Sequence, residues 1–211
     1  SSDLEHYLLP RRSDMPALGK TIIFASGNKN KYNEVAELLA PLKIRLVFGP
    51  SYASLDVEET AQTYMGNAFL KARSWADCCG LPALADDSGL EVRALNWSPG
   101  IRSARIAPTS SQRNQWLLQV LEGKDDRVAK YVAAFALCLP EEGQVWLTEG
   151  ECWGNITWRV SGTGGFGYDP LFIPMGYTQT FAELPPEIKA RISHRAIASY
   201  QLVHILQRQI W

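Results

Sequence analysis

Apolar residues recur along the chain at two spacings, one typical of β-strands and one typical of α-helices. Four apolar runs have the length and composition of strands, at residues 21–25, 44–48, 81–85 and 130–139. Helical spacing is found at four places, from about residue 30, over 63–78, over about 110–121 and from 193 onward. The run at 130–139 is long and apolar, and we expect it to be a strand near the centre of a sheet.

Other strands are predicted from weaker patterns. The run at 81–85 is expected to end in a turn at Ser88-Gly89, after which apolar residues alternate over 90–95 as in a new strand. Two strands are expected at 144–148 and 152–160, and Gly154 is expected to mark a turn or bulge.

The helical segments also predict which side chains are buried. Over 63–78 the expected apolar stripe is Met65, Phe69, Ala72 and Ala76. The last helix is expected to begin after an N-cap at Ser193 and to bury Ile197, Tyr200, Val203 and Leu206. Ser110 or Ser111 is expected to cap the helix that carries Trp116 and Leu117.

Composition excludes several classes of protein. The chain has 211 residues, of which 46% are hydrophobic and 20% charged, and its net charge is −1. This balance is that of a globular protein without a basic surface for nucleic acid, and no apolar run is long enough to span a membrane. The four cysteines have neither zinc nor disulfide spacing, which predicts reduced thiols in a cytoplasmic protein.

We expect residues 20–211 to form one domain. Residues 1–19 are polar and irregular and are predicted to be an N-terminal extension of unknown role. They contain no apolar segment of signal-peptide length, and Met15 could be an original start.

The most informative stretch is Ala85-Asp86-Asp87-Ser88-Gly89, where two carboxylates follow an apolar strand. Adjacent side chains on a strand point to opposite faces, so the two aspartates are expected to have different roles. A carboxylate here could hold Mg²⁺ beside substrate phosphates. The alternative is a turn in which Asp87 or Ser88 bonds to local backbone.

A second candidate site is the turn at Ser26-Gly27-Asn28, between a strand and a helix. The start of a helix offers backbone N–H groups and a positive dipole end to phosphate, and Lys29 and Lys31 add charge. An ordinary turn with solvated lysines is the alternative. In the next helix, Thr63, Asn67 and Lys71 share a face that is either solvated or directed at Asp87.

The glycine-rich stretch Gly162–Pro170 and the start of the last helix are further candidates. Four glycines in six residues allow backbone to approach a ligand closely, and Phe166 and Tyr168 offer rings on which a base could stack. A flexible hairpin is the alternative. His194 and Arg195 lie in a first helical turn, which disfavours cations unless an anion or polar ligand is near.

Together these segments resemble the inosine triphosphate pyrophosphatase, or Ham1-like, family. The resemblance extends from Thr21 to about Val203 and rests on six blocks in the family's order. The blocks are Ser26-Gly27-Asn28 with Lys31; Glu58-Glu59-Thr60 with Asn67-Ala68 and Lys71-Ala72; Asp86 to Leu90; Pro99-Gly100-Ile101 with Ser103-Ala104-Arg105; Gly162 to Pro170; and Lys189 with Ser193-His194-Arg195.

The resemblance implies an α/β fold in which a long twisted mixed sheet and its helices form two lobes around a central nucleotide cleft. It also implies Mg²⁺, a homodimer, and hydrolysis of deaminated purine nucleoside triphosphates (ITP, dITP, XTP) to the monophosphate and pyrophosphate, which cleanses the nucleotide pool. Two alternatives are a septum-type pyrophosphatase acting on modified pyrimidine nucleotides, and a nucleotide sensor without hydrolysis. The presence of Asp87, Glu59, Lys31 and Lys71 argues against the sensor.

The resemblance also assigns residues. Asp87 falls on the catalytic acid, which acts as base and metal ligand, and Glu59 falls on the other metal carboxylate. Triphosphate and sugar contacts fall on Ser26, Gly27, Asn28, Lys29, Asn30, Lys31, Lys71 and Ser88. The nucleoside pocket falls on Phe166, Gly167, Tyr168, Asp169, Lys189, His194 and Arg195.

Three residues depart from the family pattern. Ser26 replaces threonine and keeps the hydroxyl, Gly66 replaces glutamate, and Ala196 replaces glycine. A glycine inside a helix predicts local fraying at Gly66, and Gly66 and Ala196 could alter nucleotide preference.

Overall fold

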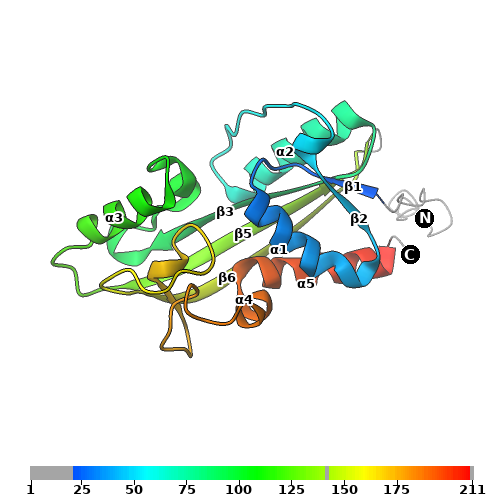
Figure 1. Cartoon of the computed structure of the whole chain (residues 1–211). Helices are drawn as coiled ribbons and strands as arrows, with labels where there is room; N and C mark the ends of the chain where they lie inside the picture. The colour runs from blue at the N-terminus through cyan, green and yellow to red at the C-terminus, as the bar shows by residue number, and fades with distance from the viewer. Residues whose placement is uncertain (1–20, 141–142, 210–211) are drawn as a thin grey trace, which may run out of the picture.

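The computed structural model describes residues 21–140 and 143–209, so the extension predicted at residues 1–19 lies outside the described residues. Within them, seven strands form one mixed sheet in the order β2-β1-β3-β5-β6-β7, with β4 paired to β3 (Figure 1). The strands are β1 Thr21–Phe24, β2 Arg45–Phe48, β3 Ala83–Val92, β4 Ser98–Pro99, β5 Val128–Cys138, β6 Val145–Ile156 and β7 Phe172–Pro174. The helices are α1 Lys29–Leu39, α2 Tyr64–Cys79, α3 Ser110–Val120, α4 Pro186–Ile192 and α5 His194–Gln209.

The sheet is parallel at one edge and antiparallel elsewhere. β1 pairs in parallel with both β2 and β3, whereas β3, β5 and β6 form long antiparallel ladders. This confirms the predicted long mixed sheet and the central position of the strand at 130–139. No helix among the described residues is both long and apolar enough to cross a membrane.

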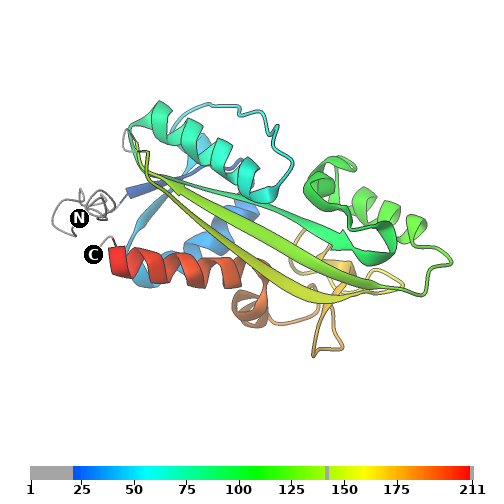
Figure 2. The ribbon, with the colours of Figure 1, turned by 180° about the vertical axis from the view of Figure 1, so that it is seen from behind.

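Helices cover both faces of the sheet at the end that includes β1 (Figures 1 and 2). Leu84 and Phe135 pack with α1 and α5 on one face, while Ala83, Ala85 and Ala136 pack with α2 on the other. Alternate residues of β3 therefore face different helices, as the two-residue period of a strand requires.

At the far end only one face of the sheet is covered. Leu90 and Val92 pack there with Leu117 of α3 and Phe172 of β7. The opposite face carries exposed side chains of β6, including Trp153, and Figure 2 shows β5 and β6 uncovered beyond α2.

Two strand predictions are wrong. β3 does not turn at Ser88-Gly89 but continues to Val92, because β5 pairs with it over its whole length. Leu95 lies in a short 3₁₀ turn after β3. β6 is likewise continuous through Gly154, where a Cβ would come within 2.2 Å of the Ile173 carbonyl oxygen. That glycine allows β7 to approach closely and marks no turn.

The helix boundaries agree with prediction better than the buried faces do. Phe69 is 36% exposed and Tyr200 is 52% exposed, although both were predicted to be buried. Trp75 joins Ala72 and Ala76 under α2, and Leu202 joins Leu206 under α5. Ala68, Ala72 and Ala76 let α2 lie close to the sheet, and the large Trp75 packs in the same cluster.

The predicted caps are partly correct. Ser193 Oγ accepts a hydrogen bond from the Ala196 N–H at 3.1 Å, as expected. Thr109, and neither Ser110 nor Ser111, caps α3 and forms a capping box with Gln112.

Fraying at Gly66 is not observed. Gly66 lies in the first turn of α2, and its N–H donates to Oγ1 of the N-cap Thr63 at 3.0 Å. A Cβ at this position would lie 2.6 Å from the Ala61 Cβ. Glycine is therefore required by the close approach of the preceding loop.

Candidate functional site

The candidate site lies beside β3, where its neighbour β1 ends. β1 pairs with β3 only at Ala83 and Leu84, and β4 pairs with it only at Glu91 and Val92. Between these short ladders, β3 borders a cavity of about 250 Å³ with Asp87, Ser88, Gly89 and Leu90. Asp87 thus remains inside a strand and still lines a cleft, whereas Asp86 is fully buried beside it, and the local sequence could not indicate this difference.

Most of the residues predicted for the site line this one cavity. They are Ser26, Asn28, Lys31, Glu59, Lys71, Asp87, Ser88, Phe166, Gly167, Tyr168, Asp169, Lys189, His194 and Arg195. Gly27, Lys29 and Asn30 are exposed and do not line it. Lys29 instead places its ammonium 4.1 Å from the centre of the Tyr32 ring and 4.6 Å from that of Phe48.

The start of α1 is capped by its own sequence. Asn28 Oδ1 accepts hydrogen bonds from the backbone N–H groups of Asn30 at 3.0 Å and Lys31 at 3.2 Å. Two of the N–H groups expected to be free for a phosphate are therefore already engaged. What remains for an anion at this end of the cavity is the helix dipole and the Lys31 side chain.

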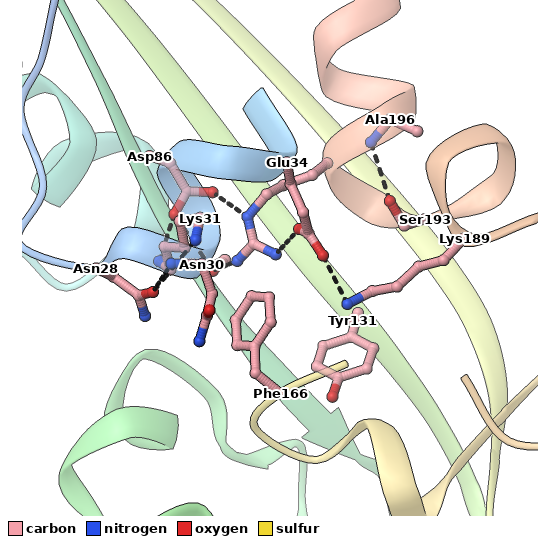
Figure 3. Close-up of polar contacts among 12 residues, drawn as sticks. Asn28, Asn30, Lys31, Glu34, Asp86, Tyr131, Phe166, Lys189, Ser193 and Ala196 are labelled. Atoms are coloured by element: carbon pink, nitrogen blue, oxygen red, sulfur yellow. Dashed lines mark hydrogen bonds and ion pairs between the residues drawn. The ribbon is translucent and has the colours of Figure 1, made fainter. Parts of the chain in front are cut away.

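Asp86 is a buried ionic anchor. Its carboxylate pairs with Lys31 of α1 and accepts from Arg195 Nε of α5 at 2.9 Å (Figure 3). Burial by itself would raise the pKa of this carboxyl, but Arg195 and Lys31 outweigh it and hold the pKa well below its ordinary value. Asp86 is therefore a permanent anion that joins two helices to the strand.

Asp87 points to the opposite face and has the opposite shift. Asn67 Nδ2 donates to its Oδ2 at 3.2 Å, and Lys71 Nζ lies 3.5 Å from its Oδ1. Burial raises the pKa of Asp87 in spite of Lys71 and Lys31. The polar face of α2 is thus directed at Asp87, one of the two alternatives that the sequence allowed, and the shift makes this carboxylate a better base.

Glu59 and Asp87 both lie close to the Lys71 ammonium. Lys71 Nζ donates to its Oε1 at 2.7 Å, and Arg105 Nη2 donates to its Oε2 at 2.7 Å. Burial favours the neutral acid, but these two cations outweigh it and lower the pKa of Glu59. Two carboxylates and two cations therefore meet at one wall of the cavity.

A second ion network joins α1 to the helices at the C-terminus. Glu34 pairs with Lys189 at 2.7 Å and with Arg195 Nη1 at 2.9 Å (Figure 3). Arg195 also donates from Nη2 to Ser88 Oγ at 2.7 Å. Each nitrogen of the Arg195 guanidinium therefore has a protein partner, which accounts for a buried cation in a first helical turn.

The glycine-rich stretch is held in shape by Asp169. Its Oδ2 accepts from the Phe166 N–H at 2.8 Å and from Lys189 Nζ at 2.6 Å. Gly165 has φ +67°, and a Cβ there would lie 2.1 Å from that oxygen. The stretch is thus an ordered loop built around a carboxylate rather than a flexible hairpin.

The two rings of this loop differ in their surroundings. Phe166 is partly exposed in the cavity, with Lys189 Nζ 4.5 Å from the centre of its ring. Tyr168 is buried in the core, and its hydroxyl donates to the Ser103 carbonyl oxygen at 3.0 Å. Phe166 can therefore receive a stacked ring more readily than Tyr168.

His194 is buried, 2% exposed, and stacks on Tyr131 with ring centres 4.6 Å apart. Burial, assisted by Arg195 and Lys189, lowers its pKa well below the ordinary value. Its Nδ1 has no hydrogen-bond partner among the described residues. The neutral ring therefore offers an unpaired polar atom beside the cavity.

Several residues near the site were not among those predicted for it. Glu34 lies one helical turn after Lys31, and its spacing could have indicated it. Ser103 and Arg105 line the cavity and belong to one of the six blocks, although no role was assigned to them. Arg113 and Tyr131 line it from distant segments that no local pattern marks.

Comparison with known proteins gives consistent matches over most of the chain. The profile of the Ham1 family matches residues 22–205. The chain is 45% identical over 190 residues to the dITP/XTP pyrophosphatase of Deinococcus deserti, which covers 88% of this chain and 90% of that protein. It is 47% identical over 194 residues to the dITP/XTP pyrophosphatase of Rhodospirillum centenum, covering 88% and 94%.

Solved structures agree with these matches. A HAM1 protein from Coxiella burnetii superposes with a TM-score of 0.81 at 40% identity, covering 89% of this chain and 98% of that one. A nucleoside-triphosphatase (dITP/XTP pyrophosphatase) from Mycobacterium abscessus superposes with a TM-score of 0.70 at 38% identity, covering 88% and 99%.

Proposed function

Since this chain belongs to the Ham1 family, we propose that it hydrolyses deaminated purine nucleoside triphosphates to the monophosphate and pyrophosphate. The substrates are dITP, ITP and XTP, and the consequence is removal of these nucleotides from the pool. Relatives that match over most of their length are dITP/XTP pyrophosphatases, and their names give no support to the alternative of modified pyrimidine nucleotides.

One observation carries the mechanism: adjacent carboxylates on β3 have pKa values shifted in opposite directions. Such divergence separates a base from a permanently ionised group. Asp87 is the base, which takes a proton from water as the water attacks the α-phosphorus. The bond from that phosphorus to its bridging oxygen breaks, and pyrophosphate leaves. Asp86 holds Lys31 and Arg195 in place.

Phosphoryl transfer needs positioning and charge neutralisation more than covalent catalysis. Lys31 and Lys71 line the cavity from α1 and α2, on either side of β3. We assign them to the triphosphate, together with Ser26, Asn28 and the dipole of α1. Lys71 exchanges Glu59 for a phosphate when substrate binds, whereas Lys31 stays paired with Asp86.

The carboxylates Glu59 and Asp87 fit a divalent cation. Both carboxylates lie near the Lys71 ammonium, so in this structure their negative charges already face a cation. Mg²⁺ is usually held by one or two carboxylates together with substrate phosphates. We therefore assign Mg²⁺ to Glu59 and Asp87. When bound, the ion would neutralise phosphate charge and act as a Lewis acid.

The purine is assigned to the other end of the cavity. Phe166 offers a ring for stacking, with Gly167, Tyr168 and Asp169 shaping the loop. Lys189 and His194 supply polar atoms at the same end, where Arg195 is bonded to Asp86, Glu34 and Ser88. Hypoxanthine and xanthine carry a 6-oxo acceptor, which a donor-rich pocket favours over the 6-amino group of adenine.

The decisive experiment is an assay of dITP with Mg²⁺, with the products separated. We expect dIMP and pyrophosphate, and no turnover after chelation of the divalent ion. dATP and dUTP serve as controls and should be poor substrates. Formation of dIDP and orthophosphate would contradict attack at the α-phosphorus, and preference for a pyrimidine nucleotide would favour the alternative.

The assembly and location are further parts of the proposal. The uncovered sheet face, with Trp97 and Trp153 exposed, supports a homodimer. All four cysteines are free, which supports a reducing compartment, the cytoplasm.

A further inference from the structure

The 3₁₀ turn η5, Gly100–Arg105, lies beside the cavity. Among the described residues, Arg105 is the only basic residue of this turn that lines the cavity. Its guanidinium pairs with Glu59 Oε2 at 2.7 Å, while Lys71 holds the other oxygen of that carboxylate. Two cations thus share one carboxylate that the proposed function gives to Mg²⁺.

The backbone near Arg105 is fixed by hydrogen bonds, whereas its side chain extends into solvent. Ser103 Oγ accepts from the Leu90 N–H at 2.8 Å, and the Ser103 carbonyl accepts from the Tyr168 hydroxyl at 3.0 Å. These bonds fix the turn to β3 and to the glycine-rich loop. The Arg105 side chain, in contrast, is 54% exposed. Its long stem can therefore move the guanidinium without moving the chain.

The other arginines of the cavity are less available. Arg195 is fully buried and bonded through three nitrogens. Arg113 donates to the Ala107 carbonyl oxygen at 2.8 Å and to Ser110 Oγ at 2.9 Å, which braces the loop before α3. In the described part of the chain, Glu59 is the sole partner of Arg105. Release from Glu59 would therefore leave a complete guanidinium fork facing the cavity.

We infer that Arg105 is a ligand of the leaving pyrophosphate, held on Glu59 until a divalent cation takes that carboxylate. The inference rests on the proposed function, because it needs a triphosphate in the cavity. Arg105 shares Glu59 with Lys71, which places it at the metal end of the cavity rather than the Phe166 end. Guanidinium forks match phosphate oxygens in charge and geometry, so release from one anion prepares binding to the next.

Arg105 therefore has opposite effects on the binding of the two ligands, the metal ion and pyrophosphate. Without nucleotide, the guanidinium competes with a metal ion for Glu59. With the metal bound, it adds charge-assisted hydrogen bonds to phosphate, each strong enough to alter affinity roughly tenfold to a hundredfold. Removal of Arg105 should therefore tighten one binding step and weaken the other, whereas mere structural damage would weaken both.

The test measures two affinities of the whole protein. The affinity for Mn²⁺ alone is measured by electron paramagnetic resonance of the free ion. The affinity for inorganic pyrophosphate is measured by calorimetry at saturating Mn²⁺. We expect Arg105→Ala to bind Mn²⁺ severalfold more tightly and pyrophosphate at least roughly tenfold more weakly. Arg105→Lys should lie between it and the parent for pyrophosphate, because lysine keeps the charge without the fork.

Arg102→Ala is the matched control. It removes the same charge from the same turn, but Arg102 is exposed and lines a separate cavity with Trp97 and Glu91. Both affinities should stay at the parent value. Thermal melting of each variant checks the fold, and Arg105→Gln replaces the alanine variant if that one unfolds.

The outcomes separate this inference from the proposed function. Failure of the parent protein to hydrolyse dITP removes both. If the parent hydrolyses dITP but Arg105→Ala binds Mn²⁺ and pyrophosphate as the parent does, the inference alone is wrong. Weaker binding of both ligands would assign Arg105 a structural role and also overturn it.

Discussion

Asp86 and Asp87 are neighbours in sequence, yet their carboxylates lie on opposite faces of β3 and in opposite electrostatic surroundings. Asp86 contacts Lys31 and Arg195, which stabilise its anion. Asp87 lies mainly under the influence of burial, which disfavours its anion. At the residue scale, this contrast predicts opposite effects on stability from two substitutions of the same kind.

Asp87→Asn should inactivate the protein and stabilise it. We expect turnover of dITP to fall at least roughly a hundredfold, because asparagine cannot accept the proton. The folded-state pKa of Asp87 is raised, so its charge costs stability above that pKa, and the neutral amide avoids this cost. Kinetics and urea unfolding at pH 7 check both parts. Turnover within threefold of the parent would move the base elsewhere.

Asp86→Asn should instead destabilise the fold by about 3–5 kcal/mol at pH 7, since it leaves Lys31 and Arg195 buried without their anion. The folded-state pKa of Asp86 is lowered, so its stabilisation is complete above about pH 4, the unfolded-state value. The stabilisation is lost as the pH falls through the folded-state pKa. Unfolding curves from pH 7 to pH 3 should show a constant difference that shrinks only below about pH 4. A difference that declines already at pH 6 would implicate another group.

The structure changes what is expected of Arg195. The resemblance assigns Arg195 to the nucleoside pocket, and a residue that reads the base would, on replacement by alanine, narrow the ratio of deaminated-purine to adenine hydrolysis. Because Asp86, Glu34 and Ser88 already occupy the guanidinium, we now expect hydrolysis of dITP and dATP to fall by similar factors, together with the melting temperature. Steady-state kinetics with both nucleotides checks this. A narrowed ratio at unchanged melting temperature would restore base recognition to Arg195.

At the scale of elements, the glycine-rich loop depends on where its Cβ atoms would lie. Gly165→Ala would place a methyl group 2.1 Å from Asp169 Oδ2 and so break the bonds that seat Phe166. We expect KM for dITP to rise roughly tenfold or more, since base stacking is worth roughly 1–3 kcal/mol. Gly167→Ala is the control, because its φ is +66° but nothing lies within 4 Å. Its free energy of unfolding should fall by about 1–2 kcal/mol, the cost of a left-handed backbone in a residue with a Cβ, and its KM should stay near the parent value. Equal KM values for the two variants would contradict this role of the loop.

At the scale of the whole molecule, the uncovered end of the sheet is the surface available for a second copy. Trp97 and Trp153 meet edge to face with ring centres 5.9 Å apart, and Lys130 Nζ lies 5.2 Å from the centre of the Trp153 ring. Glu149 lines the same surface cavity as Trp97, and charged residues of this kind would form a polar rim. Such a surface fits self-association better than permanent exposure to water.

Analytical ultracentrifugation should therefore give twice the chain mass for the parent protein. Trp153→Asp should shift it to the monomer, because a buried unpaired charge opposes association. Tyr52→Asp, at another exposed aromatic residue that is 51% exposed, should leave the mass unchanged. A monomeric parent would contradict the proposed dimer.

The sequence by itself determined the local elements and much of the chemistry. Strand and helix positions follow from periodicity and capping, which depend on residues only a few positions apart. The types of residue that bind phosphate and metal could likewise be recognised from short motifs. Ser193 illustrates this, since its role as N-cap needs only the next three residues.

Tertiary structure alone decided where β3 ends and which groups meet. Asp87 lines a cleft because β1 stops beside Leu84 while β5 continues, a relation between strands far apart in sequence. The pairing of Asp86 with Arg195 joins residues 109 positions apart. The tertiary structure also leaves Phe69 and Tyr200 exposed. Periodicity shows which residues share a face of a helix, but burial depends on which elements cover that face. Long-range contacts of this kind leave no trace in local composition, whereas their consequences, the two opposite pKa shifts, define the site.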